Sequence, residues 1–145
     1  MKQLTCLLAV LLLSFSINAQ QPEIFSTNGK AIRGYDPVAF FNQSAPVKGA
    51  DSLSYTWKNT EWLFSNRQNL ESFKKDPEKF APQYGGYCAY GVSDDHKSPT
   101  QTDTWTIVND KLYFNYNTKV KEHWSKNREQ LIEQADKKWP EVKKM

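Results

Sequence analysis

Apolar and polar residues alternate in the first half of the chain, with a polar turn in the middle of the alternation. Every second residue is apolar across Ser52–Lys58 and again across Glu61–Phe64, and Asn59–Thr60 lies between them. Period-two alternation on both sides of a short turn predicts a β-hairpin. Ser65 and Gln68 then form a capping-box pattern, which predicts that a helix follows the hairpin directly.

The second half of the chain repeats this order of hairpin and helix. Trp105–Val108 and Leu112–Phe114 flank Asn109–Asp110, and this predicts a second hairpin with a two-residue turn. Asn117 or Thr118 is expected to cap a terminal helix that Pro140 ends. The apolar residues of that helix recur at helical spacing: Val120, Trp124, Leu131, Ala135 and Trp139.

Shorter segments connect these elements. Asp36 followed by Pro37 predicts a short helix, and Asp76–Pro77 predicts another, because Asp caps a helix and Pro fits its first turn. Gly85–Gly86 predicts a sharp turn, and the Tyr-Cys-Ala-Tyr-Gly segment after it is expected to be a short strand or an extended crossing segment. Locally paired hairpins between helices indicate an α+β fold: two β-hairpins, short helices and a long C-terminal helix in one small domain.

The N-terminus has the layout of a secretory signal peptide. One positive charge precedes a short apolar run, and small and polar residues lead to Ala19. We therefore expect a signal peptide over residues 1–19, an N-terminal extension over 20–33 and the domain over 34–140. The apolar run is shorter than the roughly 20 residues that a membrane-spanning helix needs. The expected location is periplasmic or secreted, without stable membrane insertion.

Charge gives little indication of a macromolecular partner. The formal net charge is +3, and the lysines near the C-terminus alternate with acidic residues, as on a solvated helix face. We expect no nucleic-acid binding, and a monomer or a weak homo-oligomer.

Cys88 carries the main candidate chemistry. It is the only cysteine outside the predicted signal peptide, so it has no intramolecular disulfide partner in the exported chain. As a thiolate it would suit copper or zinc, and His96 and His123 are the only imidazoles available as further ligands. The alternatives are a thiol-dependent redox protein, and a structural or interaction module in which Cys88 is buried and inert.

Aromatic residues offer a second candidate site. The chain has more large aromatic side chains than a small domain needs, and a pocket formed by Asp36, Tyr87, Tyr90 and Trp105 would suit a small organic ligand. No residue is predicted to be catalytic. The chain is therefore expected to bind a small ligand or a metal ion rather than to be an enzyme.

Several of these motifs together resemble the YHS-domain family, and in particular its small exported members. The resemblance rests on Asp36-Pro37-Val38, on the hairpin ending at Phe64, and above all on the Tyr-Gly-Gly-Tyr-Cys-Ala-Tyr segment at Tyr84–Tyr90. It spans residues 34–140. Exported members mostly lack an assigned activity, so the resemblance implies a fold more than a function.

Other YHS domains resemble TRASH-type metal modules and carry three cysteines that this chain lacks. The resemblance places Ala39, Ser65 and Asn69 where those cysteines would be. None of the three side chains replaces a thiolate as a metal ligand. The resemblance alone therefore does not imply the metal site of those relatives.

Overall fold

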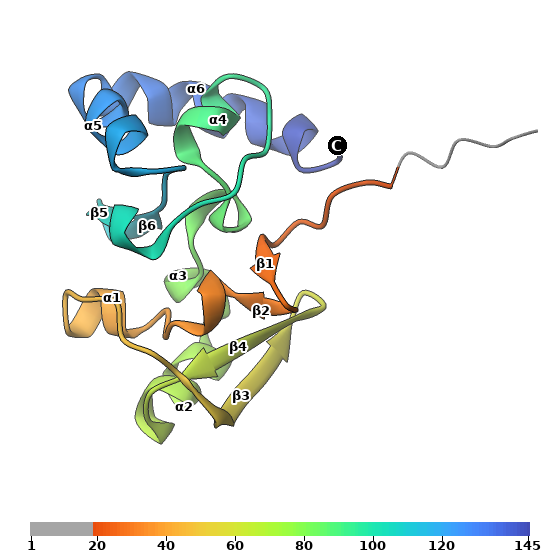
Figure 1. Cartoon of the computed structure of the whole chain (residues 1–145), viewed down its shortest axis with the longest axis vertical. Coiled ribbons are helices and arrows are strands. Elements are labelled where there is room, and N and C mark those ends of the chain that lie inside the picture. The colour runs from red at the N-terminus through yellow and green to blue at the C-terminus, as the bar shows by residue number, and fades with distance from the viewer. Residues whose placement is uncertain (1–18) are drawn as a thin grey trace, which may run out of the picture.

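The computed structural model describes residues 19–145, which form two lobes stacked along the long axis of the protein (Figure 1). The predicted signal peptide lies, except for Ala19, outside the described residues. We call the lobe with strands β1–β4 and helices α1–α3 the lower lobe, and the lobe with β5, β6 and α4–α6 the upper lobe. Both strands and helices are present in each lobe, which confirms the α+β class.

The lower lobe is built on a four-stranded sheet of order β1-β2-β4-β3. The long central pair β3–β4 is antiparallel, and β2 joins β4 in parallel. Fully buried aromatic rings, among them Phe40, Trp62 and Phe73, fill the space between this sheet and the helices. The elements are β1 (Ser26–Thr27), β2 (Lys30–Ala31), the 3-10 turn Ile32–Gly34, α1 (Ala39–Asn42), β3 (Ala50–Trp57), β4 (Thr60–Phe64), α2 (Arg67–Lys75) and α3 (Pro77–Phe80).

The upper lobe packs three helices and a small hairpin around Trp124, whose side chain is fully buried. Lys138 of α6 donates hydrogen bonds to the Ser93 carbonyl at 2.8 Å and to Asp95 at 2.7 Å, which attaches α6 to the end of α4. The elements are the 3-10 turn Gln83–Gly86, α4 (Ala89–Ser93), the 3-10 turn Thr102–Thr104, β5 (Thr106–Val108), β6 (Lys111–Tyr113), α5 (Thr118–Lys126) and α6 (Arg128–Val142).

The two lobes are joined by several direct contacts. The Phe25 N–H donates to the Gly85 carbonyl at 2.9 Å. The Arg33 guanidinium donates to the Thr100 carbonyl at 3.1 and 3.2 Å. The rings of Phe40 and Phe114 meet edge to face, with centroids 5.4 Å apart. These contacts fix the orientation of one lobe relative to the other.

Lys97 and one direct backbone hydrogen bond, from the Gln21 N–H to the Met145 carbonyl at 2.9 Å, hold the two ends of the described chain together. The Lys97 ammonium donates to the carbonyl oxygens of Gln21 (2.9 Å), Pro22 (3.4 Å), Lys143 (2.9 Å) and Met145 (3.2 Å). The predicted extension, residues 20–33, is thus attached to the upper lobe at its start and contributes strands β1 and β2 to the sheet of the lower lobe.

Both predicted hairpins are present. Asn109 and Asp110 each have a positive φ, as a two-residue hairpin turn requires. The predicted turn Asn59–Thr60 is displaced by one residue: Lys58 and Asn59 have the positive φ values, and Thr60 begins β4.

The capping-box prediction for α2 is wrong by one residue. Asn66 caps the helix, and its side chain accepts the Asn69 N–H at 2.8 Å. The Ser65 hydroxyl does not cap the helix but donates to Oδ2 of Asp36, at 2.7 Å.

Two further predictions need correction. Cys88 does not lie in a strand: it caps the short helix α4, and only an isolated bridge pairs it with Phe114. The single terminal helix is two helices, α5 and α6, which meet at Asn127, and Pro140 lies inside α6 rather than at its end. Pro140 lies in the last turn of α6, so its missing N–H and the bulk of its ring disturb only the end of the helix. Between residues 19 and 145, no helix has the length and apolar character needed to cross a membrane.

Candidate functional site

The Cys88 sulfur lies in a closed, polar environment at the start of α4. The residue is 2% exposed. Its Sγ accepts the backbone N–H groups of Gly91 at 3.4 Å and Tyr116 at 3.3 Å, and lies 3.6 Å from Oδ1 of Asn115. A thiol that donates to the Asn115 oxygen while it accepts from two N–H groups has all of its hydrogen-bonding capacity satisfied.

This environment keeps the thiol protonated. Burial raises the pKa of Cys88, and the backbone N–H groups of Gly91 and Tyr116 oppose only part of that rise. Thiolate is the nucleophile and the metal ligand, so a raised pKa disfavours both kinds of chemistry at neutral pH. The geometry favours the hypothesis that Cys88 is a packed, unreactive side chain.

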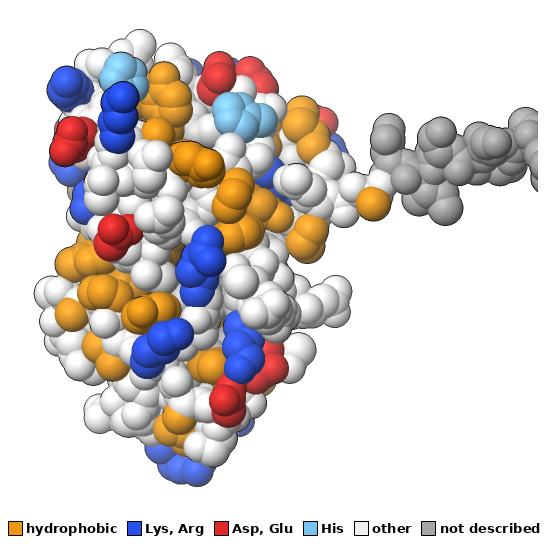
Figure 2. Space-filling view, viewed as in Figure 1, with side chains coloured by type: hydrophobic (Ala, Val, Ile, Leu, Met, Phe, Trp, Pro, Cys, Tyr) orange, Lys and Arg blue, Asp and Glu red, His pale blue; other side chains and the backbone are white. Residues whose placement is uncertain are grey.

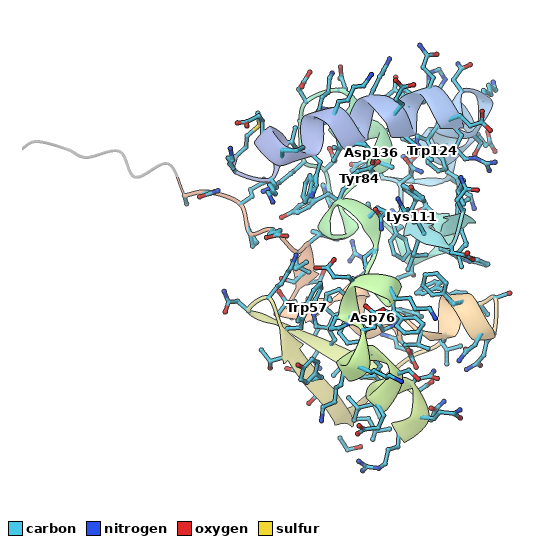
Figure 3. The ribbon with its side chains drawn as sticks, turned by 180° about the vertical axis from the view of Figure 1, so that it is seen from behind. Trp57, Asp76, Tyr84, Lys111, Trp124 and Asp136 are labelled. Atoms are coloured by element: carbon cyan, nitrogen blue, oxygen red, sulfur yellow. The ribbon has the colours of Figure 1, made fainter. Side chains whose placement is uncertain are left out.

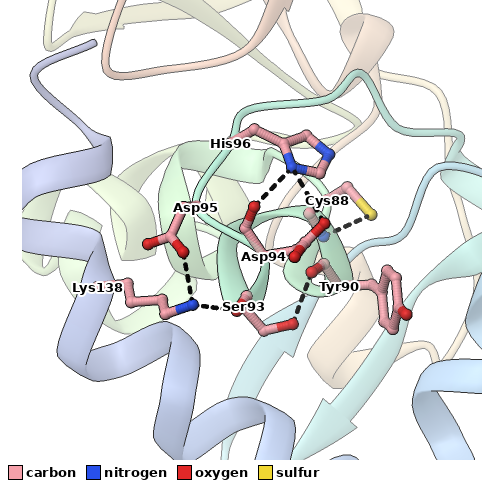
Figure 4. A network of polar contacts seen from close by, with 8 residues as sticks. Cys88, Tyr90, Ser93, Asp94, Asp95, His96 and Lys138 are labelled. Carbon is pink, nitrogen blue, oxygen red and sulfur yellow. Dashed lines mark hydrogen bonds and ion pairs between the residues drawn. The ribbon is translucent and has the colours of Figure 1, made fainter.

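The two histidines lie on the surface of the upper lobe, and Figure 2 shows them as two separate pale blue patches. Nδ1 of His96 lies 2.9 Å from the carbonyl oxygen of Asp94, as drawn in Figure 4, and its side chain is 51% exposed. His123 stacks edge-on against Tyr90, with ring centroids 5.3 Å apart. Within residues 19–145, no three His, Cys, Asp or Glu side chains form a group that could hold a metal ion.

The four residues of the predicted aromatic pocket do not line one cavity. Asp36 is fully buried, and Trp105 packs against Phe40 of the lower lobe with ring centroids 5.8 Å apart. Tyr87 donates its hydroxyl to the Pro22 carbonyl at 2.7 Å, while Tyr90 contacts His123. Each ring therefore fills a different part of the two cores.

The buried Asp36 carboxylate organises the contact between α1 and α2. Its Oδ1 accepts the N–H groups of Val38 (2.9 Å) and Ala39 (3.3 Å). Its Oδ2 accepts from the Ser65 N–H (2.8 Å), the Ser65 hydroxyl (2.7 Å) and the Asn69 amide (2.7 Å). Ala39, Ser65 and Asn69 thus all donate hydrogen bonds to a single carboxylate.

The strongest candidate for a binding site is a cleft between the two lobes, on the face shown in Figure 3. It has a volume of about 320 Å³. Trp57 and Glu78 line it from the lower lobe, and Tyr84, Asp136 and Trp139 line it from the upper lobe. None of the site residues expected from the sequence lies on its walls.

Ionic groups are fixed on both walls of the cleft. On the lower side, the Lys58 ammonium lies 2.7 Å from Glu23 and 3.5 Å from Glu78. On the upper side, the Tyr84 hydroxyl donates to Oδ1 of Asp136 at 2.8 Å. Burial, and then the hydrogen bond to Asp136, raise the pKa of Tyr84 well above its usual value, so Tyr84 stays a donor at every physiological pH.

Lys111 adds a charge without a protein partner. It lies at the start of β6, it is exposed, and it lines the cleft. Its ammonium forms no ion pair with any residue of the described part of the chain. A cleft with fixed aromatic walls and an uncommitted charge is suited to binding a small molecule.

Comparisons with protein-family models, with curated proteins and with solved structures found no match for this chain.

The environment of Cys88 leads to a testable expectation. In protein that begins at Gln20, Cys88 is the only thiol, and we expect iodoacetamide to label it more than about a hundredfold more slowly in buffer than in urea. A Cys88→Ser, Glu129→Cys double variant places the thiol on an exposed helix position as the control, and it should label fast under both conditions. Equal labelling rates for native and unfolded Cys88 would contradict burial.

Proposed function

We propose that this protein is a small exported binding protein of the YHS type, and that it binds a small organic molecule in the cleft between its lobes. The cleft is the single observation that carries the proposal. Its volume of about 320 Å³ lies at the lower end of the roughly 300–1,000 Å³ found for ligand pockets. Both lobes contribute side chains to it, so a bound molecule would contact the two lobes at once.

The walls of the cleft are held in place before any ligand arrives. The Trp57 ring packs against Trp62 and Phe73, with centroids 5.6 and 5.8 Å away. The Trp139 ring packs against Tyr84, with centroids 5.9 Å apart. Walls that are already ordered lose little conformational entropy on binding, which favours affinity.

The arrangement around Asp36 supports the YHS part of the proposal. The resemblance assigns Ala39, Ser65 and Asn69 to the positions of metal-binding cysteines, and these three residues meet at one buried point. In this chain a carboxylate and its hydrogen bonds occupy that point. The Asp36 carboxylate therefore stabilises the fold, and we place ligand binding elsewhere, in the cleft.

A soft metal ion at Cys88 is a weaker form of the binding proposal. The atoms within hydrogen-bonding distance of the sulfur are two backbone nitrogens and the Asn115 amide oxygen, none of which is a soft ligand. The redox alternative is weaker for a different reason, since burial raises the pKa of the thiol. Copper and zinc titrations of the Cys88→Ser variant and the unaltered protein test the metal alternative: tight binding that is lost in the variant would support it.

The test of the cleft uses a library of small polar and aromatic fragments, screened by two-dimensional NMR on uniformly ¹⁵N-labelled protein. We expect hits to shift the indole N–H signals of Trp57 and Trp139, while those of Trp105 and Trp124, which do not line the cleft, stay unchanged. Lys111→Ala should weaken the binding of anionic or polar hits, and Lys119→Ala on the exposed start of α5 is its control. Hits that shift only signals outside the cleft would refute the proposal.

A further inference from the structure

The chemistry of the cleft narrows the class of ligand, and this step rests on the proposed binding function. Trp57, at the end of β3, and Trp139, in α6, put one indole on each side of the cleft. Both are half-buried, and their contacts with Trp62 and Tyr84 leave part of each ring toward the cleft. The face of an aromatic ring has a negative electrostatic potential, so it attracts either a cation or the polarised C–H bonds of a sugar ring.

A cationic ligand would compete with a cation that the protein itself supplies. The Lys58 ammonium already lies 4.8 Å from the centre of the Trp57 ring and is held by Glu23 and Glu78. An organic cation would have to displace this tethered ammonium from the same ring and the same carboxylates. The protein thus fills its own cation site.

An anionic ligand would meet more negative than positive groups in the cleft. Glu23, Glu78 and Asp136 place three carboxylates on the walls, against the two ammonium groups of Lys58 and Lys111. An anion that pairs with Lys111 would be repelled by the carboxylates on both lobes. Neither sign of net charge is therefore favoured in a ligand.

A neutral ligand rich in hydroxyl groups fits all of these features. A hydroxyl group donates one hydrogen bond and accepts others, so it pairs equally well with a carboxylate and with an ammonium group. Hydrogen bonds to charged partners are the strong ones, and Asp136, Glu78 and Lys111 offer them from both lobes. We infer that the cleft binds a neutral saccharide of one or two rings, with a C–H face against Trp139, since Lys58 already lies over the Trp57 ring, and with its hydroxyl groups toward Glu78, Asp136 and Lys111.

The experiment titrates the protein with maltose, cellobiose, lactose and N,N′-diacetylchitobiose. Choline serves as a cationic comparator and glucuronate as an anionic one. Binding is followed through the indole N–H signals and by calorimetry. We expect at least one neutral sugar to shift the Trp57 and Trp139 signals at millimolar or lower concentration, and neither comparator to do so.

Substitutions of cleft residues test whether the sugar binds in the cleft. Asp136→Asn and Glu78→Gln keep the size of each side chain and remove its charge, and each should lower the affinity for that sugar by about tenfold. Glu133→Gln lies on α6 outside the cleft and should leave the affinity unchanged. Equal affinity for all three variants would overturn the inference.

The outcomes separate this inference from the function on which it rests. If fragments or a charged comparator shift the two indole signals and no neutral sugar does, the saccharide inference is overturned while the binding function stands. If no molecule of either panel shifts them, both are overturned.

Discussion

Asp36→Asn should lower the free energy of unfolding by about 3–5 kcal/mol, because the change turns one acceptor of a fully buried carboxylate into a donor. Oδ1 accepts from two backbone N–H groups, and Oδ2 accepts from two donors of Ser65 and one of Asn69. Whichever way the new amide is turned, its NH₂ group faces at least two donors. Urea denaturation followed by tryptophan fluorescence measures the loss.

Asp51→Asn is the matched control for this prediction. Asp51 is paired with Lys30, but its side chain is 80% exposed, and exposed ion pairs contribute roughly 0–1 kcal/mol. The two variants make the same chemical change and differ in burial and in hydrogen bonding. If they were equally stable, the carboxylate at Asp36 would not be organising the contact between α1 and α2.

Asp36 shows which contacts of a residue can be predicted from the sequence and which cannot. Its function as a local cap was predictable, since the Oδ1 contacts with Val38 and Ala39 lie within three residues along the chain. Its Oδ2 contacts lie 29 and 33 residues away, and no local pattern encodes them. The sequence therefore suggested a pocket residue where the structure has a buried link between two helices.

Local signals explain most of the correct predictions. Asn109 and Asp110 tolerate positive φ, and the strands on either side alternate, so the second hairpin was predicted with its turn. Helix α4 was missed because Ala89–Ser93 is too short to show a helical period. It depends instead on tertiary contacts, such as the Ala89 N–H bonded to the Phe114 carbonyl at 2.9 Å.

The residues that line the cleft could not be predicted from the sequence, for a different reason. Glu23, Trp57, Tyr84 and Asp136 come from four separate segments, and each belongs to a pattern with a simpler explanation. Trp57 continues a strand alternation, and Asp136 is one charge in a row of helix charges. The nearest signal in the sequence was the surplus of aromatic residues, which predicted a pocket but not its residues.

A second large effect is expected at Gly85, where the segment that crosses between the lobes comes closest to another part of the backbone. Gly85 has a φ of +63°, and a Cβ at this position would lie 1.8 Å from the Glu23 carbonyl oxygen and 2.9 Å from its carbon. Because the clash is with backbone, it cannot be relieved by a side-chain rotation. We expect Gly85→Ala to lower the free energy of unfolding by about 3–5 kcal/mol.

Gly29→Ala is the control for Gly85→Ala, because it adds a methyl group at a positive φ without a steric clash. Gly29 has a φ of +76°, and a Cβ added there would meet no atom within 4 Å, so this change should cost only about 1 kcal/mol. The difference between the two variants then measures the close approach of Gly85 to Glu23, which is also a wall of the cleft. Since the Phe25 N–H bonds to the Gly85 carbonyl at 2.9 Å, a chain that relaxes around the added methyl group must loosen this connection between the lobes. Equal losses in the two variants would mean that the segment at Glu23 yields freely, and the cleft would then lack the fixed wall on which its binding role depends.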